Sequence, residues 1–244
     1  MEQRKPFADD RLVNGCIYCG AGEETRDHVP SRVFLDEPFP ENLPVVFACS
    51  SCNHGFSADE EYVACLIESA IDGSTNPTRI RRTKISTILR RSPALRSRIE
   101  ASKRSQGGNE WFEPEQARMK NVILKLARGH AAFELETLCP DDPTSFKCMP
   151  LLSMTVAEQE SFDEAHYPHL FGEVGSRGMQ RTLVVQAALQ SADGSVSNIG
   201  FLINDWVEVQ EGNYRYLAID DDHGISVKIV IREYLACEVK WEYT

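Results

Sequence analysis

Two cysteine pairs with the same C-x2-C spacing constrain this chain more than any other feature. Cys16 and Cys19 form the first pair, and Cys49 and Cys52 form the second. Each pair places two thiolates within reach of one ion, and two pairs together supply the four sulfur ligands that suit tetrahedral zinc. The sequence therefore predicts a structural zinc site. An iron–sulfur cluster or metal-free thiol pairs are the alternatives.

The segment between the two pairs is longer than in a zinc ribbon. It holds 29 residues, so we expect it to carry something besides the metal ligands. Residues 15–56 are rich in turn formers and poor in apolar residues, and a bound metal would stabilise so small a unit. A zinc ion with four protein ligands has no open position, so this ion is not expected to catalyse a reaction.

The remaining composition predicts a cytoplasmic protein with no membrane partner. The N-terminal residues, MEQRKPFADD, lack the apolar stretch of a signal peptide, and no apolar run is long enough to cross a bilayer. In a reducing compartment paired cysteines hold metal more often than they form disulfides. The other four cysteines are expected to be ordinary, mostly buried thiols: Cys65, Cys139, Cys148 and Cys237.

The charge distribution is uneven. The net charge of −11 argues against nucleic-acid binding, yet residues 79–104 contain ten Lys or Arg residues and one acid, which leaves 16 basic and 36 acidic residues elsewhere. A positive segment on an acidic body can bind a polyanion. The expected phosphate contacts are Arg81, Arg82, Arg90 and Arg91. The alternative is a solvated helical face.

Local patterns predict an α+β protein. Ser57 and Glu60 have the spacing of a capping box, which predicts a helix over about 57–71. The basic segment is expected to be helical with a break near Pro93, and an amphipathic helix is expected after Pro114. Alternating and β-branched runs predict an antiparallel sheet over about 180–244, with a hairpin turn at Asp193-Gly194. The expected regions are 1–72, 73–138 (helical) and 139–244 (containing the sheet).

Polar residues between and beside the cysteine pairs form an ordered set. Asp27-His28 comes first, Asn42 follows 14 residues after His28, and Asn53 follows 11 residues later, directly after the last cysteine. Over roughly residues 14–62 this order resembles the HNH endonucleases, also called ββα-metal nucleases, in their zinc-stapled His-Asn-Asn form. The resemblance implies a β-hairpin followed by a helix, with the zinc site joining them.

The resemblance also implies a role for each residue. His28 corresponds to the general base, because a neutral imidazole can take a proton from water near pH 7. Asp27 and Asn53 correspond to ligands of a catalytic Mg²⁺ or Mn²⁺, with His54 as a candidate in place of Asn53. Asn42 corresponds to the residue that stiffens the loop and orients His28. The implied activity is metal-dependent cleavage of nucleic acid, with DNA as the expected substrate.

Two departures from the family pattern keep other functions open. Many members have Gly-Gly after the His-x-Pro step and a Lys soon after the third element, whereas this chain reads SRVFLDEPFPENL and NHGFSADEE. The alternative is a catalytically silent zinc-stapled module that binds nucleic acid or protein. A regulatory subunit or toxin-like effector is a third hypothesis. The C-terminal region is expected to bind a protein partner or to form a homo-oligomer. Histidines elsewhere are expected to pack or to face solvent: His130, His166, His169 and His223.

Overall fold

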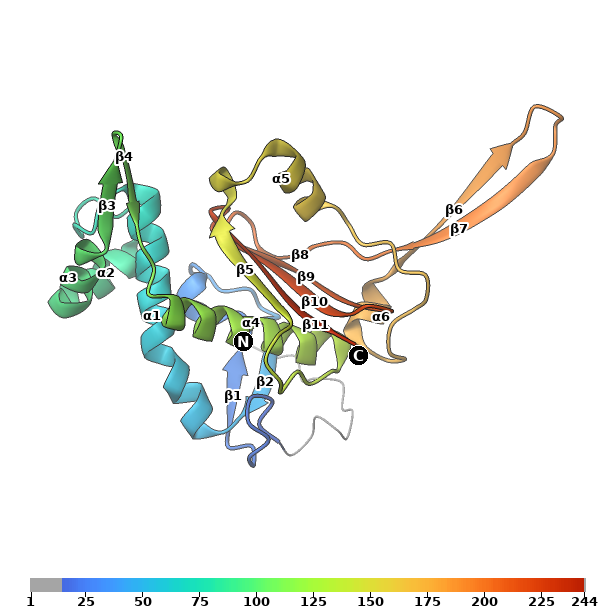
Figure 1. Ribbon diagram of the computed structural model, residues 1–244. Helices are drawn as coiled ribbons and strands as arrows, with labels where there is room; N and C mark the ends of the chain where they lie inside the picture. Colours follow the sequence, from blue (N-terminus) through green and yellow to red (C-terminus); the bar gives the residue numbers. More distant parts are fainter. Residues whose placement is uncertain (1–14, 244) are drawn as a thin grey trace.

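The computed structural model describes residues 15–243 and combines helices with antiparallel sheets (Figure 1). Strands β1 (Thr25–His28) and β2 (Val45–Ala48) pair antiparallel, with His28 opposite Val45. The short helix η1 (Arg32–Phe34) lies in the loop between them, and the 23-residue helix α1 (Ser50–Asp72) follows β2 almost directly. The expected α+β class is confirmed. Residues 1–14 of the predicted region 1–72 lie outside the described residues.

Helix α1 begins earlier than predicted. It starts at Ser50 rather than near residue 57, because the Sγ of Cys49 accepts a hydrogen bond from the Cys52 N–H at 3.4 Å and caps the first turn. Ser57, the expected cap, lies inside the helix, and its hydroxyl donates to the carbonyl of Asn53. The helix ends at Asp72 and is capped by Gly73, whose φ of 63° lies in the left-handed region that glycine adopts easily.

The middle of the chain contains three helices and a short hairpin. Pro93 separates two of the helices, as predicted, because it starts the second one. The hairpin follows the second helix and turns at Gly107 and Gly108, both with positive φ. The elements are α2 (Thr83–Arg91), α3 (Pro93–Ala101), β3 (Lys103–Gln106), β4 (Asn109–Phe112) and α4 (Gln116–Leu135).

The C-terminal part is built on a five-stranded antiparallel sheet in the order β5-β11-β10-β9-β8. Its strands are β5 (Ser145–Pro150), β8 (Val207–Gln210), β9 (Tyr214–Asp221), β10 (Gly224–Ile231) and β11 (Leu235–Glu242). The chain between β5 and β8 contains η2 (Leu151–Ser153), α5 (Val156–Asp163), α6 (Arg177–Arg181), β6 (Leu183–Gln190) and β7 (Val196–Ile203).

The predicted extent of this sheet, about residues 180–244, is corrected in two respects. Strand β5, which lies before residue 180, joins the sheet by pairing with β11. Strands β6 and β7 pair only with each other, around the predicted turn at Asp193-Gly194, and project from the body as a ribbon (Figure 1). Most ribbon side chains on both faces are exposed, so the alternation there marks a hairpin rather than part of the main sheet.

Helix α4 lies between α1 and the sheet, and most of its side chains are buried. Ile225, Val227 and Ile229 alternate along β10 and belong to the same apolar core as Val122 and Leu126 of α4. This core also includes most of the buried part of α1, so residues from the regions 1–72, 73–138 and 139–244 share it. None of the helices described over residues 15–243 combines the length and apolarity needed to cross a bilayer.

Candidate metal centre and adjoining polar site

The two cysteine pairs meet at one end of the β1–β2 hairpin. Cys16 and Cys19 come from the turn before β1, and Cys49 and Cys52 come from the start of α1. The four sulfur atoms all lie within 4.8 Å of one another, and the Sγ atoms of Cys19 and Cys49 are 3.7 Å apart. A tetrahedral zinc with Zn–S bonds of about 2.3 Å has sulfur–sulfur edges of roughly 3.8 Å. The four cysteines can therefore hold a metal ion such as zinc.

Local polarity also favours a thiolate in this cluster. Burial raises the pKa of Cys16, but backbone N–H groups of Cys49, Tyr18 and Cys19 more than offset it and bring the pKa to about 7. Burial and the neighbouring sulfurs raise the pKa of Cys52. A cation favours the deprotonated form of every ligand, so such a set is suited to binding metal with release of protons.

The cysteine cluster joins the first turn of α1 to the hairpin. The N–H of Ile17 donates to the carbonyl of Phe47 in β2 at 3.1 Å. From α1, the amide nitrogen of Asn53 donates to the hydroxyl of Thr25 at 3.1 Å and to the carbonyl of Arg26 at 3.4 Å. Asn53 therefore lies against the first half of β1, and His28 is at the opposite end of this four-residue strand.

His28 ends β1 and is half-buried. Its Nε2 lies 2.9 Å from a guanidinium nitrogen of Arg32, four residues further along the chain. Burial, and then the charges of Arg32 and Lys125, lower the pKa of His28 to about 4. The imidazole is therefore neutral near pH 7, and its Nε2 accepts a hydrogen bond from Arg32.

Asp27 belongs to a separate buried charge cluster. Neighbouring strand residues point to opposite faces, so Asp27 is 6% exposed while His28 is half-buried. The Asp27 carboxylate accepts from the hydroxyl of Tyr18 and lies 2.9 Å from the Nζ of Lys125 in α4. Lys125 also lies 2.6 Å from an oxygen of Glu60 and 2.6 Å from the hydroxyl of Ser31.

The other predicted site residues do not share the charge cluster of Asp27: these are Asn42, Asn53 and His54. Asn42 is exposed before β2, and no hydrogen bond described for residues 15–243 joins it to His28. The ring of His54 is exposed, and its Nδ1 lies 2.8 Å from the carbonyl of Ser50 in its own helix. Over the described part of the chain, only the four cysteines gather closely enough to surround an ion. Asp27, Asn53 and His54 each have other partners: Lys125, the backbone of β1 and the carbonyl of Ser50.

The four predicted phosphate-contacting arginines have different surroundings. Arg82 is buried and forms ion pairs with Asp36 and Glu68, whereas Arg81 is exposed and pairs with Asp72 at 2.5 Å. Arg90 and Arg91 are exposed at the end of α2.

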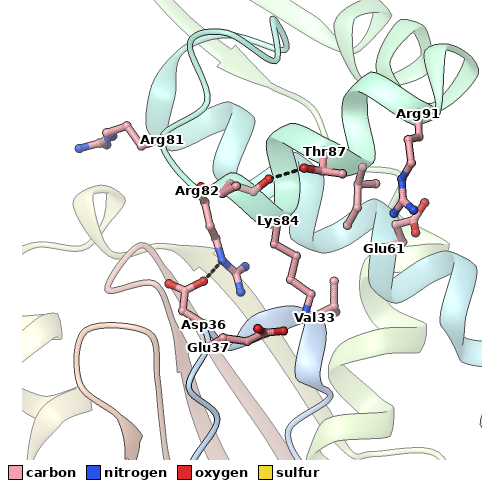
Figure 2. Close-up of a pocket in the computed structure, with 11 residues that line it drawn as sticks. Val33, Asp36, Glu37, Glu61, Arg81, Arg82, Lys84, Thr87 and Arg91 are labelled. Atoms are coloured by element: carbon pink, nitrogen blue, oxygen red, sulfur yellow. Dashed lines mark hydrogen bonds and ion pairs between the residues drawn. The ribbon is translucent and has the colours of Figure 1, made fainter.

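A cavity of about 770 Å³ lies between α2 and the loop after β1. Figure 2 shows Arg82 pointing toward Asp36 and Arg91 toward Glu61 across this cavity. Lys84 reaches the same loop and donates to the carbonyl of Arg32 at 2.6 Å. Both acidic and basic side chains line the cavity, so it is not a uniformly positive surface.

Two residues beside the candidate site were not singled out from the sequence. Arg32 has a weak local signal, since it is a basic residue four positions after His28. Lys125 had none, because it is on a helix that comes far later in the chain and only packing brings it to Asp27.

Fold and site together define an α+β protein in which a four-cysteine cluster that can bind metal lies at one end of a β-hairpin, and a half-buried histidine lies at the other end of strand β1. No protein-family profile, curated protein or solved structure matches this chain. Its function is therefore inferred from its own residues.

Proposed function

We propose that this chain is an HNH-type endonuclease that hydrolyses phosphodiester bonds in nucleic acid, with DNA as the expected substrate and His28 as the general base. The observation that supports this most directly is the cysteine cluster, which holds the first turn of α1 against β1. His28 and Asn53 consequently lie on one small hairpin–helix unit, which consists of β1, β2 and α1. They follow each other in the order that the family resemblance implies.

In the proposed reaction, Arg32 and His28 act together. The exposed guanidinium of Arg32 matches the geometry of a phosphate group and lies 2.9 Å from Nε2 of His28. When Arg32 turns to the scissile phosphate, Nε2 is released and can take a proton from the attacking water. Arg32 thus places the phosphate beside the base and stabilises the charge that develops on it.

The two predicted ligands of the catalytic ion, Asp27 and Asn53, have partners within the protein. Asp27 is paired with Lys125, and the Asn53 amide donates to β1. The catalytic Mg²⁺ or Mn²⁺ predicted from the family resemblance therefore stays a prediction, and the dependence on added metal is left to experiment.

The alternative function is a catalytically silent zinc-stapled module that binds nucleic acid or protein. Two observations favour it: Lys125 neutralises the Asp27 carboxylate, and Arg32 occupies the basic nitrogen of His28. In that case the exposed Arg90 and Arg91 would contact phosphates without any cleavage.

The two functions are separated by a cleavage assay on the zinc-loaded protein. Plasmid DNA is incubated with Mg²⁺, Mn²⁺ or a chelator too weak to remove the zinc, and nicking and linearisation are followed on gels. We expect His28→Ala to lower the rate roughly 10²–10⁴-fold, the usual contribution of a general base. His223→Ala is the control, because this exposed histidine lies in the turn between β9 and β10, outside the hairpin and α1, and it should cut normally.

Equal cutting by His28→Ala and the unmodified protein would remove His28 from the reaction. A gel shift without cleavage under every metal condition would favour the silent module.

A further inference from the structure

Two cysteines outside the metal cluster lie opposite each other on neighbouring strands of the main sheet. Cys148 of β5 is the register partner of Cys237 of β11, and their Sγ atoms are 2.9 Å apart. Cys237 is buried and Cys148 is only partly covered. Neither belongs to the group of four cysteines that can hold a metal ion.

The strand pairing places the two cysteines at a position that suits a disulfide. Just past β5, the N–H of Leu151 donates to the carbonyl of Tyr234 at 2.7 Å. Leu151 and Tyr234 therefore form a hydrogen-bonded pair. Hydrogen-bonded and non-hydrogen-bonded pairs alternate along an antiparallel ladder. The pair of Cys148 and Cys237, three positions earlier on β5, is therefore non-hydrogen-bonded. Cα atoms at such pairs are about 4.5 Å apart, within the range of roughly 4.4–6.8 Å that disulfides need.

Access differs between the two thiols. Cys148 lines an apolar cavity of about 230 Å³ between β5 and α1, together with Ile67 and Phe146. Cys237 is 1% exposed. Burial is the larger cause, and contact with Cys148 the smaller one, that raises the pKa of Cys237 well above its usual value. A small reagent therefore reaches Cys148 first, and Cys237 is the thiol that acts second.

We propose that Cys148 and Cys237 form a reversible cross-strand disulfide by exchange with a small-molecule disulfide such as glutathione disulfide. The Cys148 thiolate attacks one sulfur of glutathione disulfide, releases one glutathione thiolate and leaves a mixed disulfide on Cys148. Cys237 then loses its proton to solvent and attacks the Sγ of Cys148, which releases the second glutathione. Two protein thiols are oxidised and one glutathione disulfide is reduced to two thiols.

This bond would fasten the edge strand β5 to its neighbour. It links residues 89 positions apart and so encloses the ribbon and strands β8 to β10 in one covalent loop. A loop of that length restricts the unfolded chain, so the oxidised protein is expected to be more stable than the reduced one.

The test uses the full-length, zinc-loaded protein equilibrated in glutathione buffers of increasing oxidised fraction. Samples are quenched with an alkylating reagent, and peptides are mapped by mass spectrometry. We expect a linked peptide containing Cys148 and Cys237, together with a rise in Tm of roughly 5–10 °C that glutathione reverses. Cys139→Ala, which removes a buried thiol without a thiol partner, should behave like the unmodified protein, whereas Cys148→Ala should show neither change.

Two results would overturn the proposal: both thiols staying open to alkylation in fully oxidised glutathione, or a mixed disulfide on Cys148 that never resolves to the linked peptide. The peptide map of the unmodified protein decides between these outcomes even where a variant folds poorly. Because it identifies each cysteine, it also separates this pair from oxidation of the metal ligands.

Discussion

At the residue scale, Lys125 donates from α4 to oxygen atoms on three other segments. Its ammonium lies 2.9 Å from Asp27 of β1, 2.6 Å from Glu60 of α1 and 2.6 Å from Ser31 in the loop after β1. The Lys125 side chain is 1% exposed. A cation in this place offsets the cost of burying carboxylates, and its removal would leave them uncompensated.

Replacing Lys125 with methionine is therefore expected to destabilise the fold. We expect the free energy of unfolding in urea to fall by roughly 3–5 kcal/mol, the usual effect of removing one partner of a buried ion pair. Lys120→Met is the control, because Lys120 is exposed on the same helix, and it should change stability by no more than about 0.5 kcal/mol. Similar small effects of the two substitutions would show that Lys125 does not hold these acids in place.

At the scale of elements, α4 approaches the end of β1 at a glycine. A Cβ atom built on Gly129 would lie 2.6 Å and 2.9 Å from the two methyl carbons of Val29, the fully buried residue after His28. These distances are too short for real contacts, so either the helix or the strand end would have to move. The backbone that carries His28 is thus positioned by α4 as well as by the cysteine cluster.

Two glycine substitutions test this close approach. Gly129→Ala should lower the free energy of unfolding by about 1–2 kcal/mol, because overpacking outweighs the better helix propensity of alanine. Gly55→Ala should instead raise it by roughly 0.5–1 kcal/mol, since Gly55 is exposed in α1 and nothing lies within 4 Å of its Cβ position. Both values come from urea denaturation, and the reverse ranking would contradict the packing argument.

At the scale of the whole molecule, the C-terminal sheet supports the loop that follows β1. The side chain of Gln210 in β8 accepts from the N–H of Asp36 at 2.8 Å and donates to its carbonyl at 2.9 Å. Ion pairs also join α1 to the sheet. Glu68 of α1 lies 2.8 Å from Arg232, which follows β10, and 3.7 Å from Arg82. Because the core is also shared, the hairpin–helix unit is not expected to fold without the sheet.

Two deletions are expected to have opposite effects. Removing residues 140–244 should abolish the cooperative thermal transition followed by circular dichroism, because it exposes the core faces of α1 and α4. Replacing residues 186–200 of the ribbon with a short Gly-Ser turn should preserve the transition, because most side chains there are exposed. A cooperative transition in the first deletion, or its loss in the second, would contradict this division of the molecule.

The sequence by itself determined the features that depend on neighbouring residues. The C-x2-C spacing predicted the cysteine cluster, the proline at position 93 predicted the break between α2 and α3, and alternation predicted strands in the C-terminal part. Each of these signals is carried by spacings of a few residues, where steric limits and periodicity act directly.

Only the tertiary structure decided how distant groups meet. It brought Lys125 to Asp27, buried Arg82 beside Asp36 and set Cys148 opposite Cys237. The sequence could not supply these pairings, because a charged or sulfur-bearing residue has the same local pattern whether it faces water or a partner far away in the chain. The choice between the two depends on which faces α4 and the sheet bury together, and that is a property of packing over the whole molecule.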